Sequence, residues 1–571
     1  MTRPLLRPAA VVMDPMDMTG ARATRHSFAR ALVRRAVAQD WRIERTRFDI
    51  DELGCGTAVY RVQAEGHVWS FVAFSQRLAQ GERTDRVIAK SWDVTAALVE
   101  GEADGTRIQR MAAQVPLQEN GRAEAGALIW TRANRSERFF DYVVDRLTRG
   151  EQPERDKFGC SPYVMRSTAF YSNGKCGLAD FERFSGDHPF AVPYRSHMLA
   201  AWLLRELSYD LVEQCAVLRN PAAARLSGDW RRYLGLGNAT GLGMVPYVIN
   251  HPEVLDAWAR LREVPLASVL SRHVAPDDAD VDRVVALLGR AVTCLAEQTE
   301  LVPQPYLANP DLAAQVAPVA ALLDEWRRTG EVAGLPVSTI WRTLHDAASA
   351  TGPECRGVVA SVLTELSADL DDAVEASLRC DESRPLAPGT RCAEVLATIE
   401  DSYAWVSDFD FTDPAQTRHF WFSSADNEEP RRARRGEDPG EQVEHGVDIA
   451  RAISMLRADL ATVPGATSVA EFLLAHPWHR SSVCRVQSVG VLEYGEVRAN
   501  LLAADFVPLH VQRLQLAVYG MENFNPQSTD WLRVTLLSGA PRTGDLQNRT
   551  ADDDWVFTPR PQEGTNHVHP A

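Results

Sequence analysis

The residues best suited to acid–base chemistry lie in the run 483–500, near the end of the chain. Polar and apolar residues alternate there with a period of two, which predicts two β-strands. Neighbouring arginines would keep Glu496 ionised as a base, whereas apolar burial would raise its pKa and suit an acid. A Glu–Arg ladder on a solvated sheet would produce the same pattern. We predict that Glu496 and Tyr494 are catalytic and that the substrate is bound by Arg485, Arg498 and Asn500.

A second polar segment, residues 163–177, mixes hydrogen-bond donors with small turn residues. Donors at this density can form a polar pocket for an anionic or hydroxylated ligand. The segment contains Lys175, one of only three lysines in the chain. We therefore add Lys175 to the catalytic candidates, and Arg166, Tyr171 and Asn173 to the substrate-binding ones. The Ser-Asn-Gly tripeptide within the segment also predicts a plain β-turn, which is the alternative interpretation.

Four glycines fall within nine residues at 235–243. Such a backbone can adopt positive φ and direct its N–H groups at a phosphate. The third glycine of the dinucleotide fingerprint is replaced by Thr240, and no Gly-Lys-Ser/Thr motif of a P-loop is present. The stretch therefore predicts either a phosphate cradle or only a tight turn between helices. If it forms a pocket, we expect Asn238, Thr240, Asn250 and His251 to bind the substrate.

Two other groups of residues carry side chains suited to catalysis or to cation binding. Asp408 and Asp410 lie among aromatic residues and would serve as an acid–base pair or hold a hard cation, although aspartates also begin helices. Cys484, close in sequence to His476 and His479, would be a nucleophile beside its base. The nine cysteines are dispersed without a C-x-x-C pair. We therefore predict no metal site, no cofactor and no disulfide framework.

The composition limits the class of protein. The chain has 571 residues, of which 45% are hydrophobic and 24% charged, as in an ordinary globular protein. A net charge of −16 argues against binding to nucleic acid. No run of about 20 apolar residues is present, so we expect no membrane segment. The first residues lack the continuous apolar stretch of a signal peptide, and the cysteines are scattered, so we predict a cytoplasmic location. The arginine-rich composition is typical of GC-rich bacteria.

The first half of the chain predicts a sheet followed by helices. Apolar spacing predicts a helix at 24–39. Short β-branched and aromatic runs over 41–101 then predict an antiparallel sheet. Helices are expected from about 106 to 150 and over most of 195–400, where apolar residues recur at three and four.

The second half predicts a mixture of elements. The charged stretch 423–445 is interpreted as a solvated loop, and helix returns at 446–475. Beyond the strands expected at 483–500, a helix and a final strand precede a frayed tail that begins near residue 543. The fold class is therefore α+β, with an N-terminal antiparallel sheet, a predominantly helical middle and a C-terminal mixed region. We expect three regions, at 1–105, 106–405 and 406–571.

The leading hypothesis is a cytoplasmic enzyme that acts on a small polar, anionic metabolite by non-redox acid–base chemistry, such as hydrolysis, elimination or group transfer. One alternative is a non-catalytic interaction protein whose helices form a groove for a partner. Another is a transferase or hydrolase that depends on Cys484. A homodimer is expected only on general grounds. The enzyme hypothesis predicts that the segments 163–177, 235–251 and 484–500 meet in one concavity.

Overall fold

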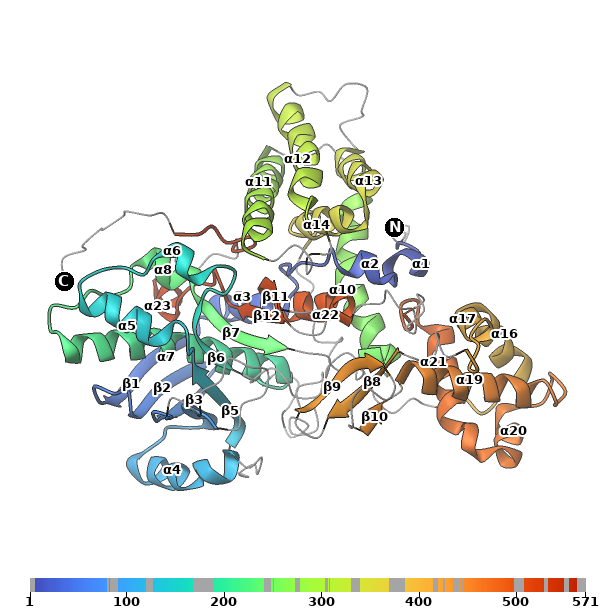
Figure 1. Ribbon diagram of the computed structural model, residues 1–571, viewed down its shortest axis with the longest axis horizontal. Coiled ribbons are helices and arrows are strands. Elements are labelled where there is room, and N and C mark those ends of the chain that lie inside the picture. Colours follow the sequence, from blue (N-terminus) through green and yellow to red (C-terminus); the bar gives the residue numbers. More distant parts are fainter. Residues whose placement is uncertain are drawn as a thin grey trace.

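A large mixed sheet with helices on both faces occupies one side of the molecule, and two groups of helices extend from it (Figure 1). This arrangement confirms the α+β fold class. The computed structural model describes residues 6–79, 82, 91–119, 127–167, 184, 188–240, 248–249, 251–272, 278–302, 307, 309–329, 339–368, 386–413, 419–424, 427–434, 441–443, 445–497, 508–527, 532–548 and 554–561.

The main sheet has nine strands in the order β1-β2-β3-β4-β5-β6-β7-β12-β11. All neighbouring pairs are antiparallel except β6 and β7, which are parallel. Strands from each of the three regions expected from the sequence therefore share one sheet. In this order the strands are Arg42–Ile50, Gly56–Ala64, His67–Ser75, Val94–Glu100, Ala127–Arg135, Tyr163–Ser167, Gly235–Thr240, Leu532–Leu536 and Met521–Pro526.

Strands β2 to β4 are apolar on both faces, which explains their continuous hydrophobic runs. Tyr60 and Phe71 point into the main core, while Val59 and Val72 point to the opposite face. One face packs against α3, Phe28–Ala38, and α7, Pro193–Arg219; the other packs against α4, Gly105–Glu119. The shorter helices near this sheet are α5 Phe140–Thr148, α6 Arg155–Phe158, α8 Gly228–Tyr233 and α23 Thr543–Gln547.

The middle of the chain forms a helical group with a core of its own, drawn above the sheet in Figure 1. Apolar residues at helical spacing, such as Val284, Leu287 and Leu288, are buried there. No helix among those that the structure describes is long and apolar enough to cross a membrane. The group comprises α10 Pro252–Leu270, α11 Asp278–Leu301, α12 Leu312–Thr329, α13 Ile340–Thr351 and α14 Pro353–Thr364.

A third group of helices lies on the other side of α10 and belongs to the main core. Between it and the large sheet lies a small sheet with the order β10-β8-β9 (Figure 1). The helices are α16 Cys392–Ser402, α17 Ala404–Ser407, α19 His445–Leu460, α20 Val469–Ala475 and α21 Arg480–Val491, and the small strands are His419–Ser424, Asn427–Arg434 and Glu441–Val443. Helix α22, Pro508–Tyr519, lies in the middle of the molecule and contacts α2, α3, α10 and β11 (Figure 1).

The N-terminal segment runs through the middle of the molecule before it reaches the sheet. It contains two short helices, α1 Ala9–Val12 and α2 Pro15–Met18. The side chain of Asp14 caps α2 by accepting a hydrogen bond from the Met16 N–H at 2.8 Å, and Pro15 occupies the first helical position. Both helices are short, so their position depends on contacts with other elements.

Several sequence predictions are wrong. The expected loop at 423–445 contains strands, and strand β5 interrupts the expected helices of 106–150. The expected strand at 483–491 is helix α21. The tail is also ordered further than expected, because Trp555 and Val556 are buried in the two large cores. The expected helix at 508–519 and the last strand at 532–536 are confirmed.

Candidate functional site

Strands β6 and β7 bring two of the predicted site segments side by side. Arg166 and Gly237 are partners in this parallel pair. The Asn238 side chain donates a hydrogen bond to the backbone carbonyl of Ser167, and the Ser167 Oγ donates to the carbonyl of Arg132 at 2.9 Å. The carboxyl ends of both strands therefore lie at one edge, which is where open sheets with parallel strands bind ligands.

The glycine-rich stretch is a packed strand as far as residue 240. A Cβ atom on Gly237 would lie 2.3 Å from the Tyr163 ring, and one on Gly235 would lie 2.4 Å from the Leu536 carbonyl oxygen. These glycines are thus needed for close approach between strands. Thr240 is the last residue of β7, but its side chain is outside the described part of the structure. The other predicted residues of these two segments that lie wholly outside the described part are Lys175, Tyr171, Asn173 and Asn250.

Glu496 forms an ion pair with Arg485, another of the residues predicted for this site. Arg485 lies on α21, and its Nη2 is 2.9 Å from Oε1 and 2.8 Å from Oε2 of Glu496. Its Nε also donates to Oε2 at 3.1 Å. Both side chains are buried. Arg498 and Asn500 lie outside the described residues.

The Arg485–Glu496 pair joins two of the predicted site segments. Arg485 Nη2 also donates to the backbone carbonyl of Ile249 at 3.0 Å. Ile249 lies two residues before His251, the N-cap of α10. The hydroxyl of Tyr403 is buried beside the pair, where burial and the Glu496 charge raise its pKa. The Glu496 carboxylate is thus engaged in a buried ion pair, and this geometry favours a role in holding the segments together.

Tyr494 is also engaged in contacts that position the chain. Its hydroxyl donates to the backbone carbonyl of Arg7 at 2.8 Å, and its N–H donates to Asp256 Oδ1 at 2.9 Å. Burial and the nearby Glu263 raise its pKa, so the hydroxyl stays protonated at neutral pH. Tyr494 therefore links the loop after α21 to the N-terminal segment and to α10.

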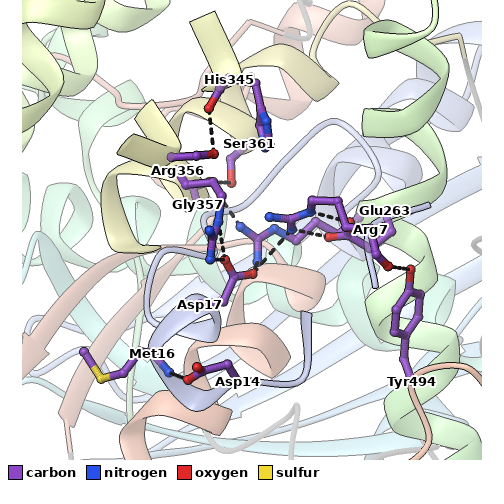
Figure 2. Close-up of polar contacts among 12 residues, drawn as sticks. Arg7, Asp14, Met16, Asp17, Glu263, His345, Arg356, Gly357, Ser361 and Tyr494 are labelled. Atoms are coloured by element: carbon purple, nitrogen blue, oxygen red, sulfur yellow. Dashed lines mark hydrogen bonds and ion pairs between the residues drawn. The ribbon is translucent and has the colours of Figure 1, made fainter. Parts of the chain in front are cut away.

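Asp17 is the centre of a buried charge cluster (Figure 2). Arg356 donates to its Oδ1 from Nε at 2.8 Å and from Nη2 at 2.6 Å. Arg7 reaches Oδ2 at 3.4 Å and also binds Glu263 through Nε at 2.7 Å and Nη2 at 2.5 Å. Arg262 Nη1 lies 4.0 Å from Asp17 Oδ2. The cluster joins the N-terminal segment to α10 and α14.

A separate pocket contains the residue best suited to proton transfer. It lies between α11, strand β11, the Tyr233 end of α8 and the segment around Thr558, with a volume of about 70 Å³. Glu522 lines this pocket and sits where the register of β11 against β12 shifts. β-Bulges of this kind redirect side chains and occur next to active sites. The pocket is also lined by Arg22, Cys160, Cys294, Glu297 and Arg560.

The Glu522 carboxyl is partly buried, and it makes no hydrogen bond or ion pair with any residue that the structure describes. Burial raises its pKa from 4.5 to about 8, and the charge of Glu365 contributes to this shift. Arg30, Arg290 and Arg22 act in the opposite direction. A carboxyl that titrates near neutral pH in a pocket can act as either acid or base.

The remaining sequence candidates have weaker geometry. The exposed Asp410 accepts hydrogen bonds from the Thr412 N–H and Oγ1, which lower its pKa, and it therefore acts as a local cap. Cys484 is only 6% exposed. His479 Nε2 lies 2.7 Å from Asp459 Oδ2. Among the described residues no group of three or more His, Cys, Asp or Glu side chains is arranged to hold a metal ion.

A larger groove of about 1000 Å³ lies between α1, α16 and the end of α21. Its lining includes Leu6, Thr398, Val491 and Glu493. Val491 is 83% exposed, which is unusual for a large apolar side chain. The groove has enough volume for a ligand or a peptide.

No known protein family, curated protein or solved structure matches this chain. The candidate site is therefore defined by its geometry alone. Sequence reasoning missed Arg22 and Glu522. Simple alternation along the strand could not have identified Glu522, because the register of β11 shifts at this residue.

Proposed function

We propose that the protein is an enzyme that carries out non-redox acid–base chemistry on a small polar metabolite, with Glu522 as the residue that transfers the proton. The observation that carries this proposal is a carboxyl that faces a pocket without a hydrogen-bonding partner among the described residues. Its raised pKa, about 8, supports the same role. A cytoplasmic location remains part of the proposal, and the cysteines that the structure describes are all free.

Glu496 and Tyr494 have positioning roles in this proposal. The Arg485–Glu496 pair and the Tyr494 hydroxyl hold the loop after α21 against α10 and the N-terminal segment. Arg166 and Asn238 stay candidates for substrate binding, because they lie at the parallel pair β6 and β7. The proposal places proton transfer at β11, on the opposite side of β12 from β7.

Metabolite profiling tests the proposal and requires no assumption about which metabolite is the substrate. The purified 571-residue protein is incubated with a bacterial metabolite extract, and mass spectrometry follows which compounds are consumed. Glu522→Gln should slow that consumption roughly 10²–10⁴-fold, the usual contribution of a general acid or base. The matched control is Glu493→Gln, in the separate groove, which should leave the rate unchanged. Equal rates for Glu522→Gln and the unsubstituted protein would remove Glu522 from the mechanism.

The second candidate function is that of an interaction protein, and the groove beside α21 favours it. An exposed Val491 in a groove of about 1000 Å³ is typical of a surface that receives an apolar side chain. Val491→Asp should then abolish binding to a partner recovered by cross-linking, while Glu522→Gln should not affect it. Loss of metabolite turnover in Glu522→Gln alone would favour the enzyme.

A further inference from the structure

At Arg22 the lining of the Glu522 pocket carries positive charge that Glu354 does not fully balance while Glu522 is protonated. Arg22 lines the pocket, and its Nη2 is 3.5 Å from Glu354 Oε1. Arg513 Nη1 lies 3.9 Å from the same oxygen. Two guanidinium groups thus share one carboxylate, which leaves one positive charge in excess among these three buried residues. Burial and the Arg513 charge lower the pKa of Arg22 to about 9.

The other ionisable residues that line the pocket, apart from Glu522, carry no net charge. Arg560 Nε is 3.1 Å from Glu297 Oε2, and Arg560 Nη2 donates to the Gly159 carbonyl at 3.3 Å. Burial raises the pKa of Cys160 to about 11 and that of Cys294 to about 12, so both thiols are uncharged at neutral pH. The unbalanced charge of the pocket therefore comes from Arg22 and its neighbours.

We propose that this pocket binds a small oxyanion, either a carboxylate or a phosphate group, between Arg22 and the carboxyl of Glu522. This inference rests on the proposed function and names the class of its substrate. An anion would supply the missing negative charge beside Arg22, and a protonated carboxyl donates a strong O–H···O⁻ hydrogen bond. A pocket volume of about 70 Å³ admits a small anion or the anionic end of a longer molecule.

Binding of the oxyanion should be coupled to a proton on Glu522. The anion binds the protonated carboxyl and is repelled by the ionised one, so affinity falls as the pH rises through the pKa of about 8. Between pH 7 and pH 8.5 the protonated fraction of such a group falls about fourfold. Several charged or titratable groups act on the Glu522 charge or line its pocket. They are Arg22 from the N-terminal segment, Arg30 from α3, Arg290, Cys294 and Glu297 from α11, Glu365 after α14, Tyr233 of α8, and Cys160 and Arg560.

Isothermal titration calorimetry of the 571-residue protein with acetate and with inorganic phosphate, each at constant ionic strength, tests the inference. Acetamide serves as the neutral isostere of acetate. We expect saturable binding of at least one oxyanion, no binding of acetamide, and a dissociation constant that rises about fourfold from pH 7 to 8.5. Glu522→Gln should still bind the anion but lose most of this pH dependence, leaving only the small part that comes from Arg22 with its pKa of about 9. Glu493→Gln should keep the full pH dependence. Binding of acetate alone or phosphate alone identifies which oxyanion is the ligand.

Three results would overturn the inference: neither oxyanion binds, acetamide binds equally well, or Glu522→Gln keeps the full pH dependence. A second measurement separates this failure from that of the proposed function. Infrared spectroscopy with ¹³C-labelled glutamate, compared between the unsubstituted protein and Glu522→Gln, gives the pKa of Glu522 directly. If the pKa is near 8 but no oxyanion binds, the oxyanion is excluded as the substrate class and the acid–base role of Glu522 stands. A pKa near 4.5 removes the acid–base role of Glu522 as well.

Discussion

Arg356 donates two hydrogen bonds to the same oxygen of Asp17, from Nε at 2.8 Å and from Nη2 at 2.6 Å, although the two residues are 339 positions apart in the chain. Asp17 is fully buried, and the guanidinium groups of Arg356 and Arg7 compensate its negative charge. The pair fixes the N-terminal segment to α14. The position of the segment is therefore decided by long-range electrostatics, because its helices are too short to be stable alone.

Asp17→Asn should destabilise the protein by about 3–5 kcal/mol, because loss of one member of a buried ion pair leaves the partner charge uncompensated. Urea unfolding followed by circular dichroism measures the change. Asp14→Asn is the matched control three residues away, since an asparagine also caps a helix, and it should cost less than about 1 kcal/mol. Similar losses for the two variants would contradict a special role for the Asp17 cluster.

Glu496→Gln should also destabilise the protein, by roughly 3 kcal/mol or more, because Arg485 would keep its charge in a buried site without a carboxylate. The same urea titration measures it. The double variant Arg485→Met, Glu496→Leu should recover much of the loss, since it removes both charges and keeps apolar volume. If Glu496→Gln instead abolishes metabolite turnover at unchanged stability, Glu496 is catalytic after all.

Gly237→Ala should destabilise the sheet, because the added Cβ would lie 2.3 Å from the ring of Tyr163. We expect a loss of about 1–3 kcal/mol, the usual cost of overpacking. Gly289→Ala on α11 is the control: its Cβ meets nothing within 4 Å, and alanine favours a helix by up to about 1 kcal/mol. A neutral Gly237→Ala would show that the sheet can accommodate the added Cβ and would contradict a packing role for this glycine.

Acid should destabilise the protein partly through two buried histidines. Burial lowers the pKa of His26 to about 3 and that of His345 to about 4, against about 6.5 in the unfolded chain. The folded state therefore binds fewer protons than the unfolded chain at acidic pH. The stability that the two neutral histidines contribute is fully present above pH 6.5 and is lost as the pH drops towards 4. At pH 5 each histidine should cost about 1–2 kcal/mol relative to pH 7.

The variant His345→Gln isolates this effect. Glu522, with its raised pKa, acts in the opposite sense, because the folded state takes up a proton as the pH falls below 8. The measurement is therefore the difference in unfolding free energy between the unsubstituted protein and His345→Gln at pH 7 and at pH 5. This difference should shrink by about 1–2 kcal/mol at pH 5. A difference that is independent of pH would show that His345 is protonated equally in both states.

Local patterns in the sequence were sufficient for the fold class and for many elements. Alternating β-branched and aromatic residues over 41–75 form β1, β2 and β3, and apolar spacing forms long helices such as α7 and α11. These periodicities depend only on neighbours in the chain. The period-two pattern at 483–491 wrongly predicts a strand where the structure has helix α21, which contains Arg485. The buried residues Val483, Val486 and Val489 are spaced by three, as on one side of a helix.

The candidate site depended on tertiary structure. Glu522 is the second residue of β11, yet its pKa is affected by Arg30, Glu365 and Arg290, which come from three other parts of the fold. Glu496 shows the same dependence, because its ion-pair partner Arg485 lies on α21, in the part of the run that the sequence predicted to be a strand. The sequence determines which side chains carry charge and which segments are apolar. Only the folded chain decides which charges meet and which lose their water, because ionic contacts and desolvation depend on distances between segments that are remote in sequence.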